Sequence, residues 1–168
     1  FVGANVAEKI ANTPIASKFL RYSLEGSGEA LSFEQDSDVS KDLEHSEVLA
    51  SKIRELSQSL KPGEKKYFYS SMDFNGGKMN PSRDQQLAYG KVKLAISIEK
   101  DAKGNISYNG EVGDTYNFDW HKVNQSNYKN EHIKLIMNNG AVIYQEIGAL
   151  QPFNWTASIS GCVHGGNK

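Results

Sequence analysis

The chain has 168 residues, of which 38% are hydrophobic and 23% are charged, and its formal net charge is -1. This size and composition fit one globular domain with its own core. The near-neutral charge gives no support for a nucleic-acid surface, which normally shows a basic excess, although the basic groove of an RNase can be hidden in a neutral total. No apolar run is long enough to span a bilayer.

The chain begins at a phenylalanine, and neither a methionine nor a signal pattern opens it. We therefore expect a mature domain or a piece cut from a longer polypeptide. Cys162 is the one cysteine, which excludes a disulfide within the chain and a cysteine zinc cluster. Because it lies in a glycine-rich tail, we expect that end to be frayed and Cys162 to have no catalytic role.

The first sixty residues have helical periodicity. Thr13 and Pro14 are typical of a helix start, and Ile15 and Phe19 follow at helical spacing. Residues 29–41 are acidic and rich in serine, and we expect a surface connection there. A second helix is expected from about residue 40 to residue 60, where a Lys-Pro-Gly sequence ends it.

From residue 65 onward, hydrophobic and polar residues alternate, which predicts strands with one buried face. Polar loops are expected at 75–84 and 124–130, and hairpin turns at 103–105 and 139–140. The expected strands are residues 67–74, 91–99, 106–112, 116–120, 133–137, 142–147 and 153–159.

Helices followed by hairpin-linked strands predict an α+β fold. We expect the N-terminal helices to pack on a highly curved antiparallel sheet that forms a half-barrel. We divide the chain into a helical part (1–64) and a sheet part that carries the active site (65–168), within one structural unit.

Reactive side chains are densest in residues 113–122, with the sequence GDTYNFDWHK. Alternate residues of a strand share a face, so Asp114 and Tyr116 line up. If Tyr116 points into the core of a regular strand, Asn117, Asp119 and His121 point the other way, whereas an intervening β-bulge would let Asp114 and His121 meet. A carboxylate beside an imidazole is a competent pair for general base catalysis, and a carboxylate can also hold a divalent cation. The alternative is an aromatic-rich strand with a solvated polar face.

Residues 103–112, with the sequence KGNISYNGEV, lead directly into the Asp-x-Tyr stretch at 114–116. This segment resembles the C-terminal activity domain of colicin M and related bacteriocins. In that family a Tyr-Asn-Gly hairpin leads into Asp-x-Tyr-Asp-Phe and then a histidine followed by an arginine. The order of the expected helices and strands over residues 15–160 also resembles the family.

The resemblance implies an antibacterial toxin that is secreted or delivered by its producer and acts in the periplasm of the target cell. It implies Mg²⁺-dependent cleavage of lipid II, the lipid-linked peptidoglycan precursor, between the undecaprenyl carrier and the pyrophosphate. The partners implied are this precursor at the membrane surface and a cognate immunity protein. No nucleic acid is expected as a partner.

Matched to the family motif, Asp114 is the first aspartate, Tyr116 the tyrosine and His121 the histidine. Lys122 stands in place of the arginine, so the resemblance implies that it contacts phosphate without the bidentate geometry of a guanidinium.

One position departs from the motif where its chemistry is most important. Asn117 occupies the place of the second aspartate, and an amide cannot act as a base. Asp119 lies two residues further on, on the same face of an extended strand, and we expect it to take over that role. Asp114 and Asp119 are thus the predicted Mg²⁺ ligands, and Asn117 remains in the predicted site.

Two other interpretations remain open. The domain can be an effector on the same scaffold with a different target, RNA or a membrane, or a binding module without catalysis. The helix expected at 40–60 is too charged to favour membrane perturbation.

Overall fold

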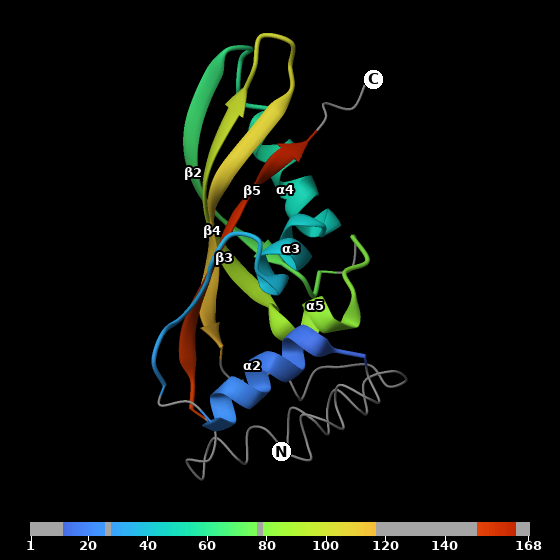
Figure 1. Ribbon diagram of the computed structural model, residues 1–168. Helices are drawn as coiled ribbons and strands as arrows, with labels where there is room; N and C mark the ends of the chain where they lie inside the picture. The colour runs from blue at the N-terminus through green and yellow to red at the C-terminus, as the bar shows by residue number, and fades with distance from the viewer. Residues whose placement is uncertain (1–11, 26–27, 77–78, 117–150, 164–168) are drawn as a thin grey trace.

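The computed structural model describes residues 12–25, 28–76, 79–116 and 151–163. Helices and strands are mixed along the chain, as Figure 1 shows. Their bounds are α2 (Pro14–Glu25), β1 (Leu31–Phe33), α3 (Asp38–Glu44), α4 (Glu47–Ser57), β2 (Glu64–Asp73), α5 (Arg83–Ala88), β3 (Lys91–Lys100), β4 (Ile106–Tyr116) and β5 (Phe153–Val163).

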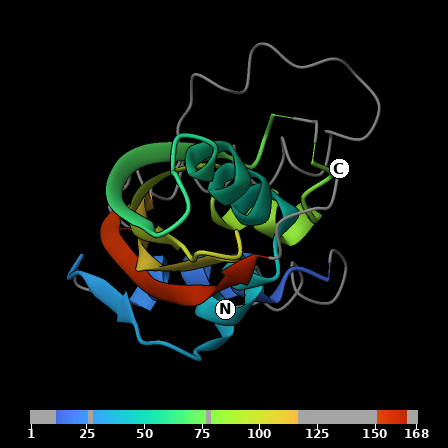
Figure 2. The ribbon, with the colours of Figure 1, turned by 90° about the horizontal axis from the view of Figure 1, so that it is seen from above.

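The five strands form one open sheet in the order β1-β5-β4-β3-β2. Strands β2 to β5 pair antiparallel, while β1 runs parallel to β5. Seen from above, the sheet curls around the helices on its inner face (Figure 2). The predicted α+β fold with a curved sheet is confirmed, with the difference that the parallel strand β1 makes the sheet mixed.

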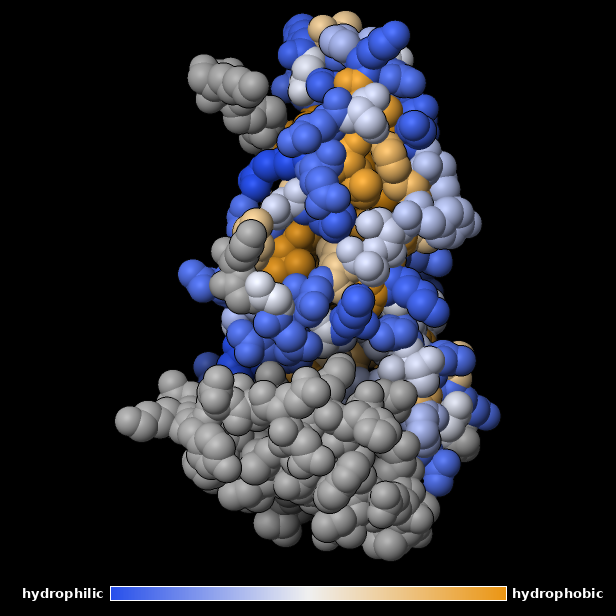
Figure 3. All heavy atoms as spheres, turned by 180° about the vertical axis from the view of Figure 1, so that it is seen from behind, coloured by the Kyte–Doolittle hydropathy of each residue, from blue (hydrophilic) through white to orange (hydrophobic). Residues whose placement is uncertain are grey.

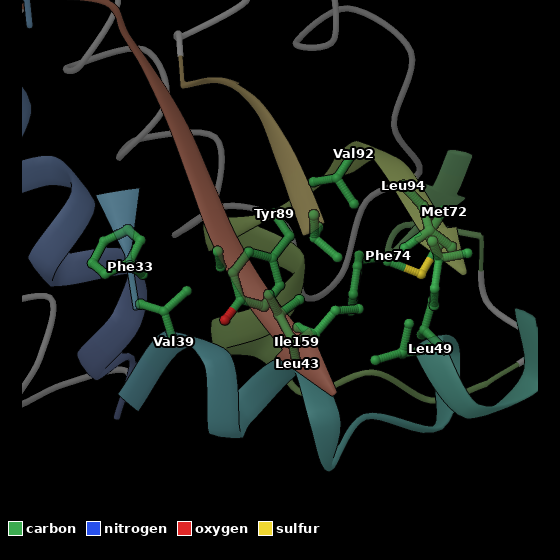
Figure 4. Packing of buried hydrophobic residues seen from close by; sticks show 14 of the residues in the cluster. Phe33, Val39, Leu43, Leu49, Met72, Phe74, Tyr89, Val92, Leu94 and Ile159 are labelled. Atoms are coloured by element: carbon green, nitrogen blue, oxygen red, sulfur yellow. The ribbon is translucent and has the colours of Figure 1, made fainter. Parts of the chain in front are cut away.

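The core lies between the helices and the inner face of the sheet. Alternate residues of β3, β4 and β5 are buried there, which follows from the period of two in a strand. Figure 4 shows Leu43, Leu49, Met72 and Ile159 pointing into this core from helices and strands. Over the coloured part of the face seen in Figure 3, polar residues predominate and apolar atoms are visible mainly in hollows.

The first helix was predicted correctly, because α2 begins at Pro14. The prediction of one continuous second helix was wrong, since residues 38–57 form two helices, α3 and α4. Ser46 interrupts them by accepting a hydrogen bond from the Leu49 backbone N–H, and so caps the start of α4. Residues 29–41 are not only a connection, because they contain β1 and the start of α3.

Further differences concern the strands. Tyr116 belongs to the same strand as residues 106–112, so the expected break before it is absent. Cys162 is exposed but lies within β5, so the expectation of a frayed end is wrong at this residue. The strands expected at 133–137 and 142–147, and the C-terminal part of the one expected at 116–120, lie outside the described residues.

The division at residue 64 stays a prediction, and β1 from the helical part pairs with β5 from the sheet part. Within the described part of the chain, no helix has the length and apolar character that crossing a membrane requires.

Candidate functional site

The two first residues of the predicted site lie at the C-terminal end of β4. Asp114 and Tyr116 are two positions apart and so share the inner face of the strand, while Thr115 between them is exposed. Their partners across the β4–β5 ladder are Trp155 and Phe153, both of which are buried. The Asp-x-Tyr stretch therefore points toward the core side of the sheet and not toward solvent on its outer face.

Tyr116 is held by aromatic rings from two elements. Its ring lies 5.2 Å from that of Phe19 in α2, edge to face, and 5.4 Å from that of Phe153 in β5. Burial raises the pKa of the Tyr116 phenol, and the nearby charge of Asp84 raises it further. The phenol is consequently a neutral hydrogen-bond donor at physiological pH.

Asp114 is half-buried on the same face. Among the described residues its carboxylate has neither a hydrogen-bond partner nor an ion-pair partner. A carboxylate offers only acceptor oxygens when ionised, and these are the atoms that a cation or a donor on a substrate would contact.

The sequence analysis missed Asp84, which it placed in a polar loop. Asp84 is buried near the start of α5, and its two carboxylate oxygens accept hydrogen bonds from the backbone N–H groups of Ile15, at 2.9 Å, and Ala16, at 2.8 Å. It therefore anchors the first turn of α2 against α5, where backbone donors have no partner within the helix. Burial raises the pKa of this carboxyl above its ordinary value, although the two N–H groups act in the opposite direction.

A signal for α5 was present in the sequence. Ser82 and Gln85 form a capping box, in which each side chain bonds the backbone N–H of the other residue. The Ser-x-x-Gln pattern directly after a proline predicts a helix start, and it would have placed Asp84 in the first turn of a helix.

A second polar contact joins α3 to α5 and to the residue that follows α5. The Tyr89 hydroxyl donates to a carboxylate oxygen of Asp42 at 2.9 Å, and Gln85 donates to the same oxygen at 3.2 Å. The Tyr89 ring in turn lies 5.7 Å from the ring of Trp155. Figure 4 shows the Tyr89 ring among the buried side chains. These contacts join α3 to α5 and place the Tyr89 ring against Trp155, the residue opposite Asp114 in the β4–β5 ladder.

The remaining predicted residues are Asn117, Asp119, His121 and Lys122, and they lie outside the described residues. Of the predicted Mg²⁺ ligands the structure therefore describes Asp114 alone. No group of three metal-ligating side chains occurs in the described ranges. One hard carboxylate oxygen suits Mg²⁺, which is commonly bound through one or two carboxylates and substrate phosphates, so the cation remains a proposal.

A shallow groove of about 340 Å³ lies elsewhere, between α4 and the strands β2 and β3. None of its lining residues belongs to β4, so it is separate from the Asp-x-Tyr stretch. It is lined by Val48, Ser51, Lys52, Glu55, Ser71, Met72, Asp73, Met79 and Lys91.

No protein-family model and no curated protein matches the chain. Solved structures similar to it include PaeM, a colicin M-like bacteriocin produced by Pseudomonas aeruginosa, with a TM-score of 0.45 and 14% identity over 91% of this chain and 52% of that one. The bacteriocin syringacin M from Pseudomonas syringae pv. tomato DC3000 has a TM-score of 0.40 and 19% identity over 89% of this chain and 51% of that one. Pectocin M2 has a TM-score of 0.38 and 13% identity over 99% of this chain and 63% of that one.

All three structures have TM-scores below 0.5 and identities below 20% to this chain. The chain spans between half and two thirds of their length. At these identities the likeness concerns the fold and not the chemistry of the site.

Proposed function

We propose that the chain is the toxic domain of an antibacterial bacteriocin and that it hydrolyses the lipid-linked peptidoglycan precursor lipid II. The observation that carries this proposal is the placement of Asp114 and Tyr116 together on the inner face at the end of β4. This is the pair that the colicin M-like motif of the sequence assigns to the active site.

The chemistry assigned to each residue follows from its side chain. The residues that would hold Mg²⁺ are Asp114 and Asp119, and a cation there would supply neutralisation of the pyrophosphate charge. The neutral Tyr116 phenol donates a hydrogen bond and shapes the pocket wall. His121 beside a carboxylate is the general base that activates water, and Lys122 contacts phosphate as a point charge.

The place of action belongs to the same proposal. A toxin with this substrate is secreted or delivered by its producer and works in the periplasm of the target cell, at the outer surface of the inner membrane. A producer that carries such a toxin needs an immunity protein.

The test is incubation of the chain with purified lipid II and Mg²⁺, followed by measurement of undecaprenol release. Asp114→Asn should reduce the rate by about 100-fold or more, since a positioned base or metal ligand contributes on this order. Glu111→Gln is the matched control, because Glu111 lies on the same strand but is exposed on the outer face. Its rate should equal that of the unmodified chain.

Absence of undecaprenol release by the folded chain at every Mg²⁺ concentration would contradict the proposal. Expression in the periplasm and in the cytoplasm of a susceptible bacterium gives an independent result. Killing from the periplasm is expected, whereas killing only from the cytoplasm would indicate an intracellular target such as RNA.

A further inference from the structure

Strand β2 is the edge strand at one end of the sheet, and it is long and carries exposed aromatic side chains. It has 10 residues and pairs only with β3 among the described strands. The opposite end is better protected, because β1 has only 3 residues and α3 covers the adjoining part of β5. There the Ser40 hydroxyl donates to the Ser158 carbonyl, and Glu44 accepts a hydrogen bond from the Ser160 N–H.

The middle of β2 exposes aromatic side chains. Tyr67 is 56% exposed and Tyr69 is 82% exposed, and their rings lie 5.2 Å apart on the outer face of the sheet. Natural proteins usually interrupt long edge strands, and exposed tyrosines are enriched in protein interfaces. The uncharged segment from Tyr67 to Met72 thus has the properties of a surface that another strand covers.

The backbone pattern shows which groups of β2 are available. The Phe74 N–H donates to the Gly90 carbonyl at 2.7 Å, and these two residues continue the β2–β3 register. In an antiparallel pair, alternate residues bond the same neighbour, so the even-numbered residues of β2 from Lys66 to Met72 bond β3. The N–H and C=O groups of the odd-numbered residues, 65 to 73, therefore point to the edge that no described strand covers.

We propose that this edge binds a second copy of the chain, so that two β2 strands pair antiparallel about a two-fold axis at Tyr69. Odd residues must then lie opposite odd residues. With Tyr69 opposite its own copy, Tyr67 lies opposite Ser71 of the second copy and Lys65 opposite Asp73 of the second copy.

Charge complementarity selects this register among those that the backbone allows. Within one chain, Asp73 lies opposite Lys91 of β3, and Lys65 lies opposite Glu99 of β3. All four side chains are on the outer face of the sheet. Joining the two β2 strands gives a row in which Lys91 and Asp73 of one copy continue into Lys65 and Glu99 of the other, with alternating sign.

The two-fold axis generates this row twice. Shifting the strands by two residues in one direction places Lys65 opposite Ser71, and shifting them in the other places it beyond the end of the strand. Either shift removes both ion pairs. Opposite charges across neighbouring strands stabilise a sheet, and like charges destabilise it, so the charges favour one register.

The experiment is sedimentation velocity on the full chain over a range of concentrations. A reversible dimer is expected. Lys65→Asp and Asp73→Lys each place like charges in both rows, so each variant should dimerise roughly tenfold more weakly or worse. Lys103→Asp makes the same charge change in the exposed β3–β4 turn, away from the edge, and should leave the dimer intact.

Mixing the two single variants gives the decisive result. In the mixed pair, Asp at position 65 of one chain faces Lys at position 73 of the other, and the second row keeps its native Asp73 and Lys65. The mixture should therefore form a dimer that neither variant forms alone, and misfolding of a variant cannot produce this recovery. A monomeric unmodified chain at every concentration, or two variants that stay monomeric when mixed, would overturn the proposal.

Discussion

The carboxylate of Asp84 is expected to make a large contribution to stability for a single polar side chain. Asp84→Ala removes the acceptors of the Ile15 and Ala16 backbone N–H groups in the first turn of α2. Loss of a capping side chain costs about 1 kcal/mol, and a buried donor without a partner costs about 1–3 kcal/mol. Removing the carboxyl offsets part of these costs, because burial disfavours its charged form, as its raised pKa shows. We therefore expect the free energy of unfolding to fall by about 2–3 kcal/mol.

For a chain of this length, this loss lowers the melting temperature by about 5–10 °C. Urea unfolding measures the loss of free energy of unfolding. It can be followed by circular dichroism and by tryptophan fluorescence, because Trp155 is buried in the same core. Glu29→Ala is the control, since Glu29 is exposed, and its effect should stay within about 0.5 kcal/mol. A loss for Asp84→Ala no larger than that of the control would refute the capping role.

The pH dependence gives a second measurement of the same group. Because the native pKa of Asp84 is raised above 3.8, the native state holds the proton more tightly than the unfolded state. The resulting stabilisation is complete below 3.8 and is lost as pH rises through the native pKa. Compared with Asp84→Asn, which cannot titrate, the unmodified chain should lose free energy of unfolding as pH rises across this window. A difference that is constant with pH would contradict the raised pKa.

Two further substitutions test the strands. The Asp101 carboxylate accepts hydrogen bonds from the Asn105 side chain and from backbone N–H groups of the β3–β4 turn, which lowers its pKa. Its contribution should be present above pH 3.8 and lost as pH falls through the lowered native pKa, so the melting temperatures of the unmodified chain and Asp101→Asn should converge in acid. Gly110→Ala should destabilise the chain by about 1–3 kcal/mol, because the added Cβ would lie 2.7 Å from the Ile96 Cα. Gly76→Ala, where the nearest atom is 3.7 Å away, should change the melting temperature little, and equal effects at both glycines would contradict the close packing of β3 and β4.

The local elements of this protein are encoded in short stretches of its sequence. Pro14 with the apolar spacing that follows it predicts α2, and the alternation from Lys91 to Glu99 predicts β3. Such patterns determine which face of an element is apolar, because that depends only on the period of the backbone. They also predict that Asp114 and Tyr116 share one face of a strand, and in the structure both lie on the inner face of β4.

The sequence alone could not show which distant segments meet. The parallel pairing of β1 with β5 joins residues 31–33 to residues 155–157, and Asp84 reaches the start of α2 from 68 residues away. A three-residue strand has no readable period, and an aspartate near a polar loop has no local pattern that marks it as buried. Each is placed by backbone groups that would otherwise be buried without a hydrogen-bond partner. For β1 these groups belong to β5, and for Asp84 they are the first N–H groups of α2. The sequence by itself thus determined elements with a clear period, such as α2 and β3, and the shared face of Asp114 and Tyr116. Tertiary structure decided what lies beneath that stretch, because only packing brings α2, α5 and the end of β4 together.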